Sequence, residues 1–593
     1  VRYTVGGDNG PPDPNLPDVV RAWNEQYLSP RFAIATTEEL FERFEKKYGN
    51  TLPVRRGDLT PYWEDGAAST ARELAENRET AEALAQTETL YALLRDAPYA
   101  PATVYGAWRG VHLFDEHTWG AANSITDPDS PDVKAQWAYK LAFLRTAQQD
   151  ERALRDAVVH PFPPVPQGAV DIVNTCSWPR AGIVILPHSL ALAGLRARES
   201  TGRPVPAQRL STGETALFLE DVPPLGCLRV LFEPGEPFVP GTPVSVKGTT
   251  LRGGILEAAV DPATGSISTL RAGGGNLVDR SAGGLNGYFY VPGRDPRRAR
   301  QDTSVAVHVA DSGPLVASLH VVSRPPGGTA LTRTVRVTAG TDRVEIIDTL
   351  WKSPVREKES VHFGFPLRIP GATIRVDNAF GIIRPDSDQL PGSCRDFFTA
   401  EHWVDASNES TGVTLAVPDA PLVEIGTMTD ETQNRGGVRS WKEHAGGGSL
   451  LWSYAMNNYW HTNYKADQEG QTVFRYAVIP HGVFDPSAAE KAGIEASQPL
   501  IPVPPQEGIA PGASLLTIEP QGVIATAFKP ASDGKGWILH LYNAGGGRAS
   551  LRMTWHGGGK GTFYRSDLAE RRGAELQLPV LMPASGIAIV RIE

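Results

Sequence analysis

The chain has 593 residues, of which 41% are hydrophobic and 21% are charged, and its formal net charge at pH 7 is -10. This length is too great for one ordinary core, so we expect several domains of a soluble globular protein. No apolar run approaches the roughly 20 residues that a membrane-spanning helix needs, and the acidic balance argues against binding to a phosphate backbone. We therefore expect neither a membrane nor a nucleic acid as partner.

Residues 1–66 have the pattern of the end of an α/β unit. The expected elements are, in order, a strand at Val1–Val5, a helix at Leu16–Tyr27, a strand at Phe32–Ala35 and a helix opened by Thr37. A Gly-rich loop that holds Asp8 follows the first strand. Because α/β folds place their chemistry in loops after strands, Asp8 is a candidate functional carboxylate. An Asp that only stabilises the turn is the other interpretation.

Residues 67–158 have the period of amphipathic helices. Thr70 and Glu73 fit a capping box at the start of the first helix. Further helices are expected at Ala102–Phe114 and Asp132–Leu154. Two or three antiparallel helices of this length form a bundle.

The end of the middle helix carries an unusual cluster. Gly110–Gly120, with the sequence GVHLFDEHTWG, places two imidazoles and two carboxylates between aromatic side chains. A neutral imidazole beside carboxylates can bind a divalent metal, and an indole ring can stack on a sugar. However, the His-x4-His spacing is not a specific zinc signature, and a solvated polar turn fits the same residues equally well.

The rest of the chain has the pattern of β-strands separated by short Gly, Pro and Asp turns. We expect a small β-domain at 159–240, a large β-sandwich at 241–520 and a C-terminal β-domain at 521–593. Expected strands include Gly182–Leu186, Leu228–Leu231, Leu315–Val322, Arg343–Thr349 and Phe474–Ile479. The predicted fold class is therefore multidomain α+β.

Several short segments follow a known pattern in their order along the chain. They include Gly57–Asp65, Glu76–Arg78, Asn174–Arg180, Glu257–Ile267 and Asp567–Arg571. In this order the chain resembles glycoside hydrolase family 38, the α-mannosidases, over essentially its whole length. The resemblance implies the C-terminal remnant of a catalytic α/β barrel, a three-helix bundle and large antiparallel β-sandwich domains.

The resemblance also implies an activity and a cofactor. It implies a zinc-dependent, retaining glycosidase that hydrolyses terminal α-linked mannose from glycans, with a mannose-containing oligosaccharide or glycoside as partner. It places His117 on a zinc ligand and Asp8 on the proposed general acid/base. The family's next Asp falls on Thr118 here, and Asp115 is the carboxylate that can replace it.

Candidate sugar contacts surround these residues. Aromatic rings could form walls for a sugar, and amide or carboxylate groups could bind its hydroxyls. For the Trp residues, ordinary packing is the other interpretation. The candidates are Trp63, Asp115, Glu116, Trp119, Trp460, Asn463 and Tyr464.

Two family features have no counterpart here, namely the His-x-Asp pair and the Asp nucleophile, since only seven residues precede Asp8. We therefore expect the nucleophile and the remaining zinc ligands to lie outside this chain, and the chain alone to be inactive. The alternatives are a non-catalytic carbohydrate-binding β-sandwich protein and a related enzyme for another α-linked sugar. Compartment and oligomeric state stay open.

Overall fold

The computed structural model describes residues 10–94, 98–159, 168–186, 194–433, 442–505 and 510–593. The chain divides into two compact units, Val1–Gly57 and Asp58–Glu593. Among the described residues, no helix combines the length and the apolar character that crossing a membrane requires. The expected strand at Val1–Val5 and the candidate Asp8 lie outside the described residues.

Within residues 10–57, the first unit contains two helices, α1 (Leu16–Gln26) and α2 (Thr37–Tyr48), and a 3₁₀ turn at Gly49–Thr51. Helix α2 is opened by Thr36 rather than Thr37: the Thr36 hydroxyl accepts from the Glu39 N–H at 3.2 Å, and the Glu39 carboxylate accepts from the Thr36 N–H at 2.9 Å. These reciprocal bonds form a capping box.

The strand expected at Phe32–Ala35 is not formed, and this prediction is wrong. The main-chain groups of Phe32 bind a side chain instead of a neighbouring strand. Asn24 Nδ2 donates to the Phe32 carbonyl at 2.8 Å, and Asn24 Oδ1 accepts from the Phe32 N–H at 2.9 Å. A side-chain amide thus satisfies backbone groups that a ladder would otherwise pair.

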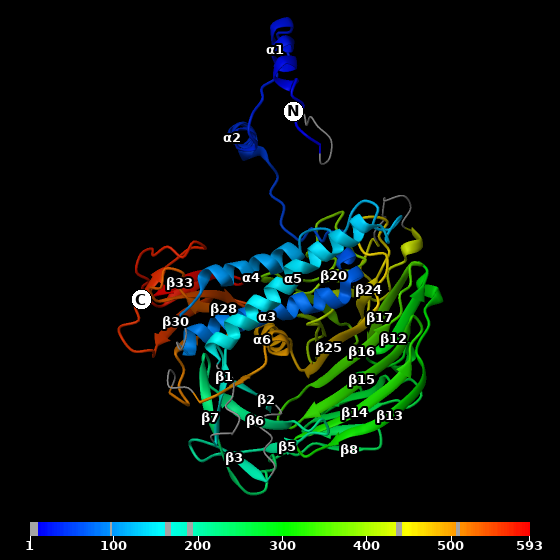
Figure 1. Cartoon of the computed structure of the whole chain (residues 1–593), viewed down its shortest axis with the longest axis vertical. Helices are drawn as coiled ribbons and strands as arrows, with labels where there is room; N and C mark the ends of the chain where they lie inside the picture. Colours follow the sequence, from blue (N-terminus) through cyan, green and yellow to red (C-terminus); the bar gives the residue numbers. More distant parts are fainter. Residues whose placement is uncertain (1–9, 95–97, 160–167, 187–193, 434–441, 506–509) are drawn as a thin grey trace. The chain divides into compact units, whose positions relative to one another are not determined.

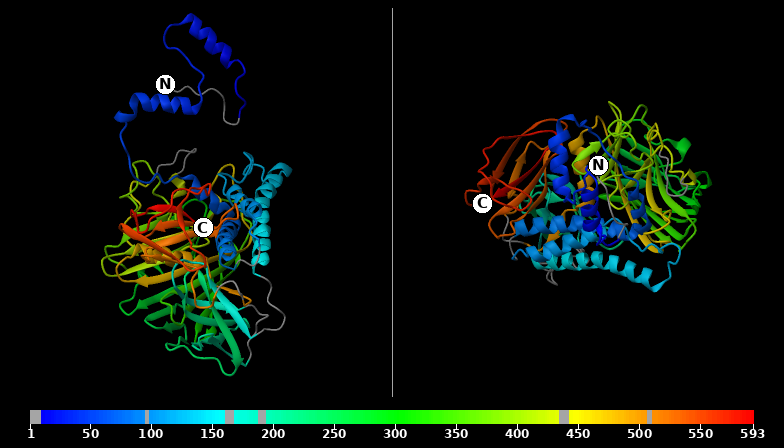
Figure 2. Two further views of the ribbon diagram at one scale, coloured as in Figure 1. Left: turned by 90° about the vertical axis from the view of Figure 1, so that its left-hand side faces the viewer. Right: turned by 90° about the horizontal axis from the view of Figure 1, so that it is seen from above.

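The second unit begins with the predicted three-helix bundle. A 3₁₀ helix, η2 (Trp63–Thr70), runs into α3 (Ala71–Leu94), and α4 (Pro101–Phe114) and α5 (Pro131–Val158) follow. Both α4 and α5 have Pro in their first turn, where the missing N–H is not needed. The three helices lie side by side along one side of the β region (Figures 1 and 2).

The predicted capping box at the start of α3 is not formed. The Thr70 hydroxyl donates to the Ala67 carbonyl at 3.1 Å, inside η2. The Ala71 N–H donates instead to Oε1 of Gln468 in the large sandwich, at 2.9 Å. A tertiary contact therefore caps this helix, which fixes the start of α3 against the sandwich.

The small β-domain follows the bundle as two sheets, with strand orders β26-β1-β7-β3-β4 and β2-β6-β5. Residues Ala169–Asn174 of β1 pair antiparallel with β7 and β26. The strands are β1 (Ala169–Asn174), β2 (Arg180–Leu186), β3 (Leu195–Glu199), β4 (Pro204–Val205), β5 (Ala207–Arg209), β6 (Thr215–Val222), β7 (Gly226–Pro234) and β26 (Ile501–Val503).

The large sandwich contains a nine-stranded sheet, a five-stranded sheet and a smaller four-stranded sheet. The nine-stranded sheet has the order β13-β14-β15-β16-β25-β22-β21-β18-β19, and its strands are β13 (Thr303–Ser312), β14 (Val316–Arg324), β15 (Gly328–Thr338), β16 (Val344–Lys352), β18 (Thr373–Asn378), β19 (Gly381–Ile383), β21 (Trp403–Ser407), β22 (Gly412–Ala416) and β25 (Gly470–His481). Helix α6 (Pro486–Ser497) follows β25.

The other two sheets of this domain are shorter. The five-stranded sheet has the order β12-β17-β24-β23-β20, with β12 (Gly287–Pro292), β17 (Glu359–Pro366), β20 (Phe398–Thr399), β23 (Leu422–Ile425) and β24 (Leu450–Asn457). The four-stranded sheet has the order β11-β10-β9-β8, with β8 (Ser245–Lys247), β9 (Thr250–Gly253), β10 (Leu256–Val260) and β11 (Ile267–Ala272). Three further 3₁₀ turns lie at Arg280–Ala282, Pro296–Arg298 and Glu431–Gln433.

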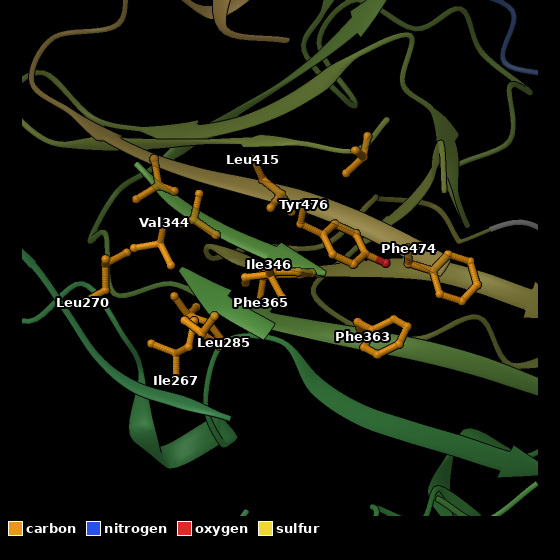
Figure 3. Close-up of a cluster of buried hydrophobic side chains, with 14 of the residues drawn as sticks. Ile267, Leu270, Leu285, Val344, Ile346, Phe363, Phe365, Leu415, Phe474 and Tyr476 are labelled. Carbon is orange, nitrogen blue, oxygen red and sulfur yellow. The ribbon is translucent and has the colours of Figure 1, made fainter. Parts of the chain in front are cut away.

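The core of the large sandwich lies between its sheets. Strand β16 alternates buried and half-buried residues, as expected of a strand with one inward face. Figure 3 shows Val344 and Ile346 of β16 in one apolar cluster with Leu270 of β11 and Phe365 of β17. The centroid of the Phe365 ring lies 5.1 Å from that of Tyr476 in β25. All residues of β17 are buried, and this strand lies between β12 and β24 in its sheet. The 3₁₀ helix η2 contacts the neighbouring strands β24 and β23.

Two C-terminal sheets complete the unit, with strand orders β27-β30-β32 and β28-β29-β33-β31. Their apolar side chains share one core with the bundle, in which Leu84 and Leu93 of α3 pack with Phe528 and Leu539. The strands are β27 (Leu516–Glu519), β28 (Val523–Pro530), β29 (Trp537–Asn543), β30 (Ala549–Trp555), β31 (Phe563–Arg565), β32 (Val580–Met582) and β33 (Ile587–Ile592). Helix α3 is thus held at both ends by β-domains.

Candidate functional site

A cleft of about 450 Å³ lies where the bundle meets the large sandwich. Its walls come from η2, from the outer face of α3, from the turn after α4 and from the sandwich residues Thr399 and Leu422. The cleft brings together five of the sequence-predicted sugar contacts with the candidate metal ligand His117. They are Trp63, Asp115, Glu116, Trp119 and Tyr464.

His117 lies on the exposed side of this cleft, with 67% of its side chain accessible. Its Nδ1 contacts Oε1 of Glu116, and its ring stacks on Trp63 with 6.1 Å between the ring centroids. Glu116 also binds Lys140, whose Nζ lies 2.7 Å from the Glu116 carbonyl and 3.1 Å from Oε2. The imidazole is thus positioned between a carboxylate and an indole.

The two carboxylates after α4 differ in environment. Partial burial disfavours the charged form of Glu116, but hydrogen bonds from His117 and Lys140 outweigh this and lower its pKa. For Asp115, desolvation by the cleft wall raises the pKa, and the hydrogen bond from Asn77 Nδ2, at 3.0 Å, offsets only part of that effect. Asp115 is therefore the more readily protonated carboxyl of the pair.

The aromatic candidates divide into one exposed ring and three buried ones. Trp63 is 41% exposed at the cleft, as a stacking surface must be. In contrast, Trp119, Trp460 and Tyr464 are at most 8% exposed, and they pack with Phe114 in one apolar cluster. This burial favours the packing interpretation for these three rings.

The buried rings nevertheless fix the cleft. The Trp460 indole donates to Oδ1 of Asp65 at 2.9 Å, and the Tyr464 hydroxyl donates to the His117 carbonyl at 2.8 Å. Asn463 has a positive φ of 64°, which Asn tolerates better than most residues. Its carbonyl accepts from the Trp119 N–H at 2.8 Å. This loop of the sandwich therefore holds the His117 turn in place.

Two charged cleft residues were missed as site candidates, Glu64 and Arg78. Burial raises the pKa of Glu64 despite a hydrogen bond from the Thr399 hydroxyl. Arg78 donates from Nε to the Pro418 carbonyl at 2.7 Å and from Nη2 to the Glu401 carbonyl. Both lie in the Gly57–Asp65 and Glu76–Arg78 segments quoted above, which were the signal for them.

The residues around His117 do not form a complete zinc site among those that the structure describes. One imidazole and the Glu116 carboxylate are fewer donors than the three protein ligands of a catalytic zinc site. Within the described ranges, the only group of three metal-binding side chains with converging ligand atoms is elsewhere, at Asp377, His402 and Glu490. The described residues around His117 therefore do not by themselves form a catalytic zinc centre.

Comparison with known proteins finds one matching family model and solved structures with a similar fold. The family model for the glycosyl hydrolases family 38 C-terminal beta sandwich domain matches residues 522–584. The fold is similar to that of an α-mannosidase from Enterococcus faecalis V583, with a TM-score of 0.74 and 12% identity over 99% of this chain and 75% of that chain. A protein in glycosyl hydrolase family 38 from Enterococcus faecalis gives 0.71 and 12% over 98% and 76%.

No curated protein matches the sequence. The family model and the two solved structures together support a relationship with glycoside hydrolase family 38. The predicted fold class, multidomain α+β with a bundle and antiparallel sandwiches, is confirmed.

Proposed function

We propose that this chain carries part of the active site of a zinc-dependent, retaining α-mannosidase-like glycoside hydrolase that removes terminal α-linked mannose from glycans, with the nucleophile and the remaining zinc ligands supplied from outside this chain. The observation that carries the proposal is the cleft at His117, where an exposed imidazole, an exposed indole and several carboxyl groups meet in a fold shared with an α-mannosidase. Such a mixture of one apolar wall and convergent polar groups is typical of a carbohydrate site.

The proposed roles follow from the chemistry of each side chain. Trp63 stacks on one face of the sugar, and the charged groups of Glu64 and Arg78 bind its hydroxyls. Retaining hydrolysis needs two carboxyl groups about 5 Å apart, one of which donates a proton to the leaving oxygen. By family resemblance Asp8 is the proposed acid/base. His117 is proposed as one zinc ligand, and a bound zinc ion would hold the sugar hydroxyls electrostatically.

The test measures zinc content and calorimetric binding of methyl α-mannoside for the complete gene product, before and after treatment with a chelator. The proposal expects His117→Ala to lose one equivalent of zinc and to weaken α-mannoside binding. His112→Ala is the matched control, because His112 is an exposed imidazole on α4 outside the cleft lining. Unchanged zinc content and unchanged binding in His117→Ala would contradict the proposal.

A second candidate is a non-catalytic carbohydrate-binding protein. The incomplete donor set around His117 favours it, because stacking on Trp63 and hydrogen bonds alone can hold a sugar. For this candidate, α-mannoside binding persists in chelator and in His117→Ala but is lost in Trp63→Ala. The same titrations therefore separate the two functions.

A further inference from the structure

A second group of ligand-type side chains lies at the junction of the large sandwich, α6 and α3. Asp377 belongs to β18, His402 directly precedes β21, and Glu490 is on α6. Strands β18 and β21 pair with Val376 opposite Val404, which brings Asp377 beside His402. One ligand atom from each of Asp377, His402 and Glu490 lies within 4.8 Å of those of the other two.

The two ring nitrogens of His402 have different surroundings. Nε2 lies 2.9 Å from Oε1 of Glu82 on α3, and the other Glu82 oxygen accepts from Gln498 Nε2 at 2.7 Å. Glu82 thus holds a proton on Nε2. Nδ1 is buried and, among the described residues, makes no hydrogen bond of good geometry, although the His402 side chain is only 10% exposed. A carboxylate bound to one nitrogen, with the second nitrogen facing a further carboxylate at a distance longer than a hydrogen bond, is compatible with a metal-binding histidine.

The spacing around Nδ1 suits a metal better than a hydrogen bond. Nδ1 is 3.5 Å from Oδ2 of Asp377, and this oxygen already accepts from the His402 N–H at 2.9 Å. An N–H···O bond is normally about 2.7–3.2 Å long. In a tetrahedral zinc site with bonds of about 2.0–2.1 Å, neighbouring ligand atoms are about 3.3 Å apart. The observed separation of 3.5 Å between Nδ1 of His402 and Oδ2 of Asp377 is close to this ligand–ligand distance.

The charge of the cluster also favours a cation. Asp377 and Glu490 are 2% and 9% exposed, and the carboxyl groups of Glu82 and Glu401 face the same region. The guanidinium of Arg78 forms its hydrogen bonds with main-chain carbonyls rather than with these carboxylates. Burial lowers the pKa of His402, but Asp377 and Glu82 outweigh it and raise that pKa well above its usual value, so a protonated His402 is the counter-charge of these carboxylates when no metal is bound. A divalent cation would take the place of that proton.

An ion can reach this cluster through a cavity. A space of about 520 Å³ is lined by Glu82, Glu401, His402 and Glu490, with Cys176 and Gln498 further along its wall. It leaves room for a water molecule as a fourth ligand. Burial raises the pKa of Cys176 to about 11, so its thiol is not expected to compete as a ligand. The Trp403 indole donates to Oε2 of Glu490 at 3.1 Å and orients that carboxylate.

We propose that Asp377, His402 Nδ1 and Glu490 bind a divalent transition-metal ion, which the mixed imidazole and carboxylate donors suggest is Zn²⁺. Glu82 is a positioning residue that fixes the imidazole. The ion links β18, the start of β21 and α6, and through Glu82 it links them to α3. This site uses none of the residues around His117 and stands independently of the proposed glycosidase function.

The test titrates metal-stripped full-length chain with Zn²⁺ by calorimetry and counts bound zinc by mass spectrometry. His402→Gln and Glu490→Gln should each abolish one zinc site, with at least a 100-fold loss of affinity, and Glu82→Gln should weaken it 10- to 100-fold. His540→Gln is the matched control, since His540 lines the same cavity outside the three ligands. His117→Ala should keep this site, which separates it from the proposed catalytic metal.

Folding of each variant is checked by its melting temperature in EDTA. Zn²⁺ should raise the melting temperature of the wild type and of His540→Gln, but not of Glu490→Gln. Glu490→Gln keeps an oxygen for the Trp403 indole, so it tests the proposal even if His402→Gln does not fold. Equal zinc stoichiometry and equal affinity in the wild type and in Glu490→Gln would overturn the proposal.

Discussion

The Tyr464 ring packs against Gly66 of η2, and its hydroxyl binds the His117 carbonyl. Gly66→Ala therefore tests whether Tyr464 stabilises the turn that carries His117. A Cβ added at Gly66 would lie within 2.6 Å of three ring carbons of Tyr464. Non-bonded carbons prefer about 3.5–4.0 Å, so the ring would have to retreat by about 1 Å. It has little room, because it is 4% exposed and its centroid lies 4.9 Å from that of Trp460.

The expected cost has two parts. Overpacking a well-packed core costs about 1–3 kcal/mol. A shift of Tyr464 also breaks the hydrogen bond to the His117 carbonyl, which contributes about 1 kcal/mol. The sum, about 2–4 kcal/mol, should appear as local opening of the turn after α4. It corresponds to roughly 30- to 900-fold faster amide exchange there.

Hydrogen exchange followed by mass spectrometry measures this directly in peptides that cover residues 114–121. Gly381→Ala is the control, because a Cβ at Gly381 meets nothing within 4 Å and Gly381 does not have a positive φ. If exchange in these peptides is the same in Gly66→Ala and Gly381→Ala, the contact between Gly66 and Tyr464 does not hold the turn.

Three further predictions concern binding, stability and pH. Trp63→Ala should weaken α-mannoside binding about 10-fold in calorimetry, with little change in melting temperature because the ring is 41% exposed. Asn174→Ala should lower stability by about 3 kcal/mol in thermal melts, because the two N–H groups of Asn174 Nδ2 are shared among three main-chain carbonyls and its Oδ1 accepts from the Cys176 N–H at 3.0 Å. Burial favours neutral Glu345, but Arg336 and Arg343 outweigh it and lower its pKa to about 2. The charged carboxylate therefore stabilises the fold above about pH 4.5, and this contribution is lost as pH falls toward 2. Glu345→Gln should therefore reduce the fall in melting temperature as the pH is lowered from about 4.5 toward 2.

Contrary results have specific meanings. Unchanged mannoside affinity in Trp63→Ala would remove the proposed stacking surface. A melting temperature of Asn174→Ala equal to that of the wild type would show that water replaces the amide. If the melting temperature of Glu345→Gln falls with pH in the same way as that of the wild type, other carboxylates govern acid unfolding.

The bundle illustrates what the sequence predicts well. The helix expected at Ala102–Phe114 begins one residue earlier, at Pro101, and the one expected at Asp132–Leu154 extends to Val158. Long amphipathic periods decide such elements locally, so tertiary contacts shift only their ends. The strands of the sandwiches were also predicted from a local pattern, namely apolar or alternating runs between short Gly, Pro and Asp turns.

The errors arose where side chains outside the regular pattern satisfy the backbone. At Phe32 the side chain of Asn24, eight residues away, replaced a strand partner, and at Ala71 the amide of Gln468, far away in the sequence, replaced the predicted Thr70 cap. The burial of Trp460 likewise depends on elements far away in the sequence. The cluster of Asp377, His402 and Glu490 could not be found from spacing, because β-strand pairing and helix packing assemble it.

The central claim is that the cleft at His117 binds a terminal α-linked mannose. The most direct measurement is a calorimetric titration of the full chain with methyl α-mannoside, in parallel with Trp63→Ala and His117→Ala. We expect saturable binding to the wild type that both substitutions weaken. Equal binding by all three proteins, or saturable binding to other glycosides and none to α-mannosides, would contradict it.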